Sequence, residues 1–356
     1  MTTRDARTKH APQYSASAPS PSAPSLSAPS PSVPSFDSAP APAPATGAGA
    51  GRRVLAAAAL AATAPYLALK TAWLAGSRIG IPDGSVLLEA GPFLTVANAV
   101  TLAMDACVIL LVLVLTRPWG LRTPAWMLTV PVFTATGLLT PILLGFPGQL
   151  LVRALGFGDG PEVAAAREPF LDSWVFIVVY TGFTVQGLAL AGLFVPYARR
   201  RWGRRWQGAA GERLPSSTGV VAAAAASGAL VLAASFLYWA FGGTAGLSAE
   251  RAEAFSAESA VGSVAHAMCA LAAGAGALLL ARGGALRARW PLGLAWVGGA
   301  ATLAWGAWLL NASLGPQLGD GEGPSAAAQL IYAGQMVTGA LTTAVLTRFL
   351  ISRRES

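Results

Sequence analysis

Long apolar runs, separated by short polar segments, dominate the chain from about residue 54 onward. A helix needs about 20 predominantly apolar residues to cross the hydrocarbon core of a bilayer. Eight runs reach that length, and each predicts one membrane-spanning helix: 54–75, 93–116, 125–145, 173–197, 218–241, 259–281, 291–312 and 327–350. Prolines inside some runs are compatible with membrane helices when neighbouring groups satisfy the freed carbonyls. The pattern predicts an all-α integral membrane protein with eight transmembrane helices.

The first 50 residues have a different pattern, with repeats of Pro, Ser and Ala such as SAPSPSAPS and few apolar side chains. A segment of this composition cannot bury enough apolar surface to fold. We therefore predict a disordered tail over residues 1–50. The apolar run that follows is longer than the core of a signal peptide and lies far from the start of the chain, so we expect it to be retained as a helix.

Basic residues are distributed unevenly between the two sides that the eight spans define. One side carries 19 Lys and Arg residues and the other carries 4. The positive-inside rule makes the first side cytoplasmic, so both chain termini are expected in the cytoplasm. The odd-numbered loops are then external, and they hold 11 acidic residues. Because this asymmetry accounts for the net charge of +8, the charge does not require a nucleic-acid partner.

Two segments in the last apolar run of each half share Tyr, Gly, Val and Gly at the same spacing: Tyr180–Gly187 and Tyr332–Gly339. Three further matches occur in the same order: Trp73–Ile81 with Trp239–Leu247, Met104–Cys107 with His266–Cys269, and Gly158–Gly160 with Gly319–Gly321. We therefore predict an internal repeat, with four helices in 51–213 and four in 214–356. Halves of four spans enter the membrane from the same side, so the two four-helix repeats are parallel.

The segment Trp239–Leu247 resembles the signature of small four-helix membrane proteins of unknown function from actinobacteria. Lys70–Gly76 is similar to the corresponding part of larger uncharacterised actinobacterial membrane proteins. The resemblance implies a duplicated four-helix membrane domain in the bacterial cytoplasmic membrane. It implies no activity.

Three ionisable residues within the predicted spans are candidates for an intramembrane polar site: Asp105, Lys70 and His266. An ionised carboxylate at the depth of Asp105 is costly, so it must face the bundle interior, be protonated or be paired. It is either a coupling site for protons or cations, or a structural link between helices. We expect Lys70 to extend to the outer interface; the alternative is that it reaches Asp105. His266 could form a proton relay with Asp105 across the repeat axis, or simply be hydrogen-bonded in the interior.

Uncharged polar residues in the repeated motif extend this candidate site: Gln186, Tyr180, Tyr332 and Gln335. These side chains could line a central cavity, or they could form hydrogen bonds that hold helices together. For the motif as a whole we expect tight helix packing. Five arginines at the cytoplasmic end of the fourth span could bind anionic lipid headgroups, or serve only to fix topology: Arg199, Arg200, Arg201, Arg204 and Arg205.

The absence of known metal-binding and catalytic motifs argues against most other classes of protein. The chain has two cysteines and two histidines, without CxxC, HExxH, a Walker loop or GxSxG, so we expect no metal site, no cofactor and no enzyme active site. An intramembrane enzyme would need a nucleophile or a set of metal ligands that the sequence does not show, and two other functions are considered. One is a permease for a small molecule or an ion, with its site between the two repeats. The other is a non-transporting membrane scaffold that binds lipid or a partner protein.

Overall fold

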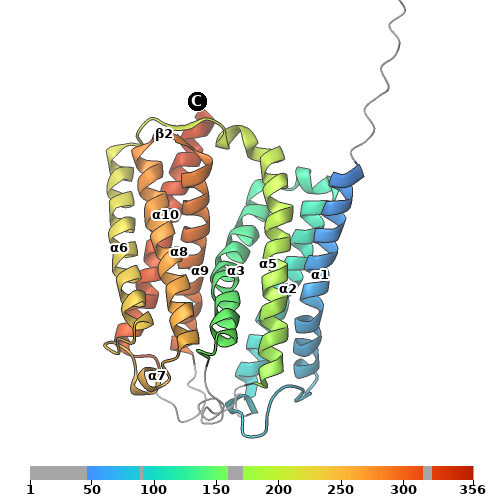
Figure 1. The fold of residues 1–356 in the computed structure, drawn as a ribbon. Helices are drawn as coiled ribbons and strands as arrows, with labels where there is room; N and C mark the ends of the chain where they lie inside the picture. Colours follow the sequence, from blue (N-terminus) through green and yellow to red (C-terminus); the bar gives the residue numbers. More distant parts are fainter. Residues whose placement is uncertain (1–45, 89–90, 159–170, 316–322, 356) are drawn as a thin grey trace, which may run out of the picture. The chain divides into compact units, whose positions relative to one another are not determined.

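The computed structural model describes residues 46–88, 91–158, 171–315 and 323–355. Within them, eight long helices run side by side (Figure 1), and each is long and apolar enough to cross a membrane. They are α1 (Thr46–Leu74), α2 (Gly91–Thr116), α3 (Ala125–Ala154), α5 (Ser173–Trp202), α6 (Ser216–Ala240), α8 (Ala257–Arg282), α9 (Arg289–Leu314) and α10 (Ala326–Glu355). The eight predicted spans are confirmed as helices.

Short elements connect the long helices. They are the 3-10 helices η1 (Val86–Leu88), η2 (Pro118–Arg122) and η3 (Gly203–Trp206), the short helix α7 (Ala249–Glu253), and two strands, β1 (Ala209–Gly211) and β2 (Gly284–Arg287). The strands pair antiparallel, with Ala209 opposite Arg287. The α5–α6 and α8–α9 connections are therefore joined at one end of the molecule.

The first helix begins earlier than the sequence pattern predicts. Residues 46–50 are its first turns, although the predicted tail extends to residue 50. The reason is local, because Pro44 is the last proline before Pro65 and the residues between are mostly Ala and Gly. Ala favours a helix strongly, and although Gly47 and Gly49 weaken this preference, the stretch contains no proline that would end the helix. Residues 1–45 lie outside the described part.

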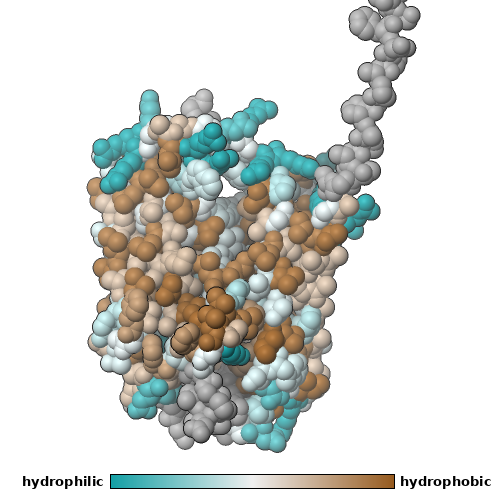
Figure 2. Space-filling view, viewed as in Figure 1, coloured by the Kyte–Doolittle hydropathy of each residue, from teal (hydrophilic) through white to brown (hydrophobic). Residues whose placement is uncertain are grey.

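The surface of the bundle divides into an apolar middle and two polar ends (Figure 2). Large apolar side chains are exposed along the helices, including Val220, Leu230, Val231 and Leu330. A soluble protein rarely leaves so much contiguous apolar surface in water, whereas the acyl chains of a bilayer would cover it. The chain is an integral membrane protein.

The helices pack as two groups of four. In the first group α1 packs on α2 and α5, while α3 packs on α2 and α5; in the second, α6 packs on α8 and α10, while α9 packs on α8 and α10. Each helix pair in the first group thus has a counterpart in the second. Most of the helix–helix contacts between the groups are made by α3, which packs against α8 and α9, and Phe194 of α5 also stacks on Trp296 of α9.

The turn after the first helix has the same conformation in both groups. The Trp73 indole Nε1 donates to Ile79 O at 2.8 Å, and the Trp239 Nε1 donates to Ala245 O at 3.0 Å. Gly76 and Gly242 follow with φ of 88° and 84°, a conformation that favours glycine.

The second glycine of this turn receives the same kind of contact in both groups. The Gly80 carbonyl accepts a hydrogen bond from the backbone N–H of Asp172, directly before α5. The Gly246 carbonyl accepts one from the Ser325 hydroxyl, directly before α10. In each group this bond ties the first helix to the start of the last.

The glycines of the Tyr180–Gly187 motif permit close packing. A Cβ on Gly182 would lie 2.9 Å from Ala62 O of α1, and one on Gly187 would lie 2.4 Å from Leu143 of α3. In the second motif, Gly334 faces α6 and Gly339 faces the backbone of α9. The prediction that the motif serves helix packing is confirmed at these positions. The Gly158–Gly160 and Gly319–Gly321 match lies largely outside the described residues.

Candidate functional site

Lys70 and Asp105 form a buried ion pair between α1 and α2. The Lys70 Nζ lies 3.0 Å from Asp105 Oδ2, and the two side chains are 1% and 7% exposed. The expectation that Lys70 extends to the outer interface is therefore wrong, and the alternative pairing is correct. The physical reason is that either charge alone would be strongly disfavoured at this depth, whereas together each satisfies the other.

An aromatic cluster lies beside this ion pair. The Lys70 Nζ lies 3.6 Å from the centroid of the Tyr66 ring, a favourable cation–π position. Tyr66 packs edge-on against Phe183, which in turn contacts Tyr180. Tyr180 thus belongs to an aromatic cluster beside the ion pair.

Gln186 joins α5 to α1 a few turns away. Its Nε2 donates to the Thr63 hydroxyl at 2.9 Å, and both side chains are buried. The Thr63 hydroxyl donates in turn to Ala59 O. A satisfied hydrogen bond of this kind holds two membrane helices together, which is the structural alternative that the sequence allows for Gln186.

His266 lies in the second group among aromatic side chains. Its ring stacks on Phe236 with centroids 5.1 Å apart and meets Trp305 edge-on at 5.4 Å. The Gln335 Nε2 lies 3.4 Å from His266 Nδ1. Tyr332, one turn before Gln335, accepts a hydrogen bond from Arg251 of α7.

The structure does not bring Asp105 and His266 together. Asp105 is paired with Lys70 inside the first group, and His266 contacts Gln335 inside the second. Their helices, α2 and α8, are not among the main packed pairs of the described bundle. The predicted relay between Asp105 and His266 therefore lacks a geometric basis, because the groups meet through α3 instead.

The five arginines at the end of α5 differ in their surroundings. Arg201 is half-buried and donates to the carbonyls of Gly120 and Thr123 and to the Tyr197 hydroxyl. Its guanidinium links the α2–α3 connection to α5, and these hydrogen bonds occupy the donors that a lipid headgroup would need. The exposed members are Arg199, Arg200 and Arg204, and the side chain of Arg205 lies outside the described residues.

A cavity of about 670 Å³ lies between the two groups. Its walls come from α2, α3, α5, α9 and α10, and it extends from the end where α1 begins and α10 finishes, here called the basic end. Figure 2 shows the surface hollowed between the groups toward this end. The opposite end, which carries α7, is called the acidic end.

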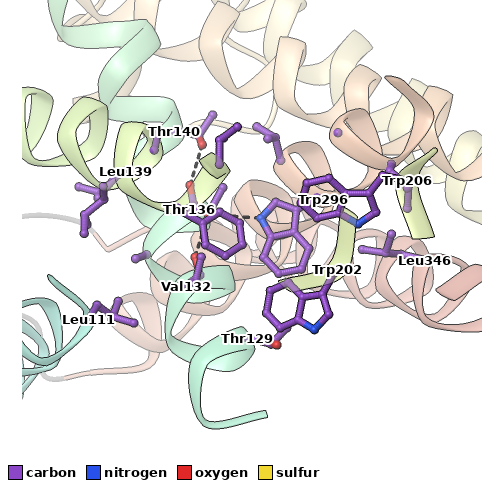
Figure 3. Close-up of a pocket in the computed structure, with 18 of the residues that line it drawn as sticks. Leu111, Thr129, Val132, Thr136, Leu139, Thr140, Trp202, Trp206, Trp296 and Leu346 are labelled. Atoms are coloured by element: carbon purple, nitrogen blue, oxygen red, sulfur yellow. Dashed lines mark hydrogen bonds between the residues drawn. The ribbon is translucent and has the colours of Figure 1, made fainter. Parts of the chain in front are cut away.

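Apolar side chains form most of the cavity wall, and the indole rings of Trp202, Trp206 and Trp296 gather on one side of it (Figure 3). The sequence pattern gives no sign of the cavity. No single helix could reveal it, because the space exists only where the two groups fail to close on each other.

The groups are held together at the acidic end. Arg153 of α3 makes a bidentate contact with Glu258 of α8, with Nε–Oε1 and Nη2–Oε2 distances of 2.9 and 2.8 Å. The Gln149 Nε2 donates to the Glu258 carbonyl at 3.2 Å. Two parallel hydrogen bonds between a guanidinium and a carboxylate form a well-defined link.

Midway along the bundle the two groups are in close contact. A Cβ on Gly137 of α3 would lie 2.4 Å from Ala300 O of α9, so the two backbones cross closely. The Trp305 Nε1 donates to Leu138 O at 3.0 Å across the same crossing. The groups are therefore joined at the acidic end and in the middle. Toward the basic end a cavity lies between them, where contacts remain through the Phe194–Trp296 stack and the β1–β2 pair.

Among the residues that the structure describes, no group of three His, Cys, Asp or Glu side chains could hold a metal ion. Comparison with protein-family models, curated proteins and solved structures found no match to the chain.

Proposed function

We propose that the chain is a membrane permease for an apolar or amphipathic small molecule, with its site in the cavity between the two groups of helices. One observation carries the proposal: the groups are in close contact at the acidic end and midway, and a cavity lies between them toward the basic end. A transporter that alternates access has this arrangement when its site faces one side of the membrane.

The two groups are proposed to be parallel repeats of one four-helix unit. The proposal is supported by the matched set of packed helix pairs and by the matched turns at Trp73 and Trp239. Parallel repeats are related by an axis along the membrane normal, and transport sites lie between such repeats. With the basic end in the cytoplasm, the cavity faces inward.

The walls of the cavity limit the class of solute. The threonines among them donate their hydroxyl protons within their own helix: Thr129 to Ala125 O, Thr136 to Val132 O and Thr140 to Thr136 O. Asp105 and Lys70 do not line the cavity. A small ion would thus find few free polar partners, whereas an apolar group would be well covered.

Alternating access can be tested without knowing the solute. A cysteine at Thr140, inside the cavity, is introduced after Cys107→Ser and Cys269→Ala, and a membrane-impermeant maleimide is added to either side of the membrane. A permease exposes this cysteine to both sides, more slowly from the acidic side, because the Arg153–Glu258 contact must first open.

Arg153→Ala is expected to accelerate labelling from the acidic side several-fold, while the exchanged pair Arg153→Glu with Glu258→Arg returns it toward the original rate. The same maleimide on Phe241→Cys, exposed at the acidic end, is the positive control. Labelling of Thr140→Cys from the basic side alone, in every variant, would contradict a permease and favour a non-transporting scaffold.

A further inference from the structure

We propose that the cavity binds an acyl chain of an anionic phospholipid from the leaflet at the basic end, with the headgroup at Arg289. The inference rests on the proposed function in naming this lipid as the permeated molecule. The binding site itself depends only on the shape and charge of the cavity.

The cavity has the dimensions of a ligand site. Its volume of about 670 Å³ lies within the usual range for small-molecule pockets, about 300–1,000 Å³. Three of its apolar lining residues, Val195, Val297 and Ile351, are also exposed on the outside of the bundle. A chain of the surrounding bilayer can therefore enter from the membrane without crossing water.

The inner wall suits a hydrocarbon chain. Leu139, Phe194 and Trp296 contribute apolar surface, and the Trp296 ring is fixed by stacking on Phe194 and by its Nε1, which lies 3.4 Å from the Thr136 hydroxyl oxygen. Covering such surface with methylene groups is favourable in proportion to the area. A rigid aromatic wall also loses little side-chain freedom when the chain binds.

The rim of the cavity carries the charge that selects the headgroup. Arg289 is the one ionisable side chain among the described lining residues, and it is exposed at the start of α9. Trp202 and Trp206 line the same end, and indoles favour the level of the headgroups. Arg199, Arg200 and Arg204 are also exposed at the end of α5 and in η3. This surface is complementary to an anionic headgroup and gives a zwitterionic one less advantage.

The experiment uses the full chain in nanodiscs of phosphatidylcholine that contain a fixed fraction of lipid with brominated acyl chains. Bromine quenches tryptophan fluorescence on contact, so brominated phosphatidylglycerol should quench more strongly than brominated phosphatidylcholine. Trp296→Phe should reduce the part of the signal that differs between the two lipids, because Trp296 lines the cavity together with Trp202 and Trp206, and the other tryptophans do not.

Two variants test the cavity and its rim. Gly293 lines the cavity and no atom lies within 4 Å of where its Cβ would be, so Gly293→Phe should fill the space and abolish the preference for phosphatidylglycerol. Arg289→Gln should lower that preference about fivefold, the effect expected for one basic residue near an anionic surface. The matched controls are Gly262→Phe, also in open space but outside the cavity, and Arg78→Gln at the acidic end.

Equal quenching by the two lipids, or a preference for phosphatidylglycerol that persists in both variants, would contradict the proposed site. The quenching would then come only from the lipid that surrounds any membrane protein. Cysteine labelling separates this result from the proposed function. Two-sided labelling of Thr140→Cys without lipid preference would refute this lipid and retain the permease. Lipid preference with one-sided labelling would support the binding site and refute permeation.

Discussion

At the scale of single residues, the Lys70–Asp105 pair has an informative counterpart. In the proposed repeat, the register set by Trp73 and Trp239 aligns Lys70 with Phe236, and the register set by the cysteines aligns Asp105 with Ala267. Phe236 and Ala267 belong to one buried apolar cluster. The same place between the first two helices of a group is therefore filled by an ion pair in one group and by apolar side chains in the other.

This substitution leads to a prediction about stability. Asp105→Ala or Lys70→Phe alone leaves a buried charge without its partner and should lower the free energy of unfolding by about 3–5 kcal/mol. The double variant, which copies the second group, should recover most of that loss. Thermal unfolding of the four proteins in one detergent measures the coupling between the two changes. A double variant as unstable as the two single changes added together would show that the pair does not act as a unit.

The sequence could predict part of this site. A carboxylate midway along an apolar span must be paired, protonated or turned inward, so the need of Asp105 for a partner follows from its position alone. The choice of Lys70 does not, because a long side chain near a helix end can also reach the interface. Which of the two Lys70 adopts depends on how α1 is rotated relative to α2, and the sequence pattern of a single helix does not determine that rotation.

At the scale of helices, α3 is the element that joins the two groups. Its residue Gly137 crosses the backbone of α9 at Ala300, and its Arg153 reaches α8. The sequence predicts α3 as a span, although the helix continues to Ala154, past the predicted end at residue 145. The extension carries Gln149 and Arg153, and both bind Glu258.

The crossing at Gly137 predicts a position-specific effect of one methyl group. Gly137→Ala places a Cβ against the carbonyl of Ala300, which is backbone and cannot rotate away, so we expect a loss of about 1–3 kcal/mol. Gly145→Ala on the same helix is the control, because the nearest atom to its new Cβ is 4.0 Å away. Thermal unfolding compares the two variants. Equal midpoints would mean that α3 and α9 are less closely packed than this crossing requires.

At the scale of the whole molecule, the eight spans and their order follow from composition, because a run of about 20 apolar residues has few other stable structures. The cavity does not follow from it. Its walls come from five helices in two groups, and its size depends on a close crossing at Gly137 and an ion pair at Arg153. Contacts of this kind depend on side chains far apart in the sequence.

The orientation of the bundle decides which leaflet the cavity faces, and it can be predicted from charge. The loops at the basic end contain most of the chain's arginines, and basic loops are translocated across the membrane poorly. We therefore expect that end to stay in the cytoplasm. Single cysteines at Leu286 in β2 and at Phe241 after α6 lie in exposed positions near the two ends. With the native cysteines replaced, an impermeant maleimide added to intact cells should label Phe241→Cys and leave Leu286→Cys unlabelled until the membrane is permeabilised. The reverse pattern would place the cavity in the outer leaflet, where the excess of anionic lipid that favours binding at Arg289 is absent.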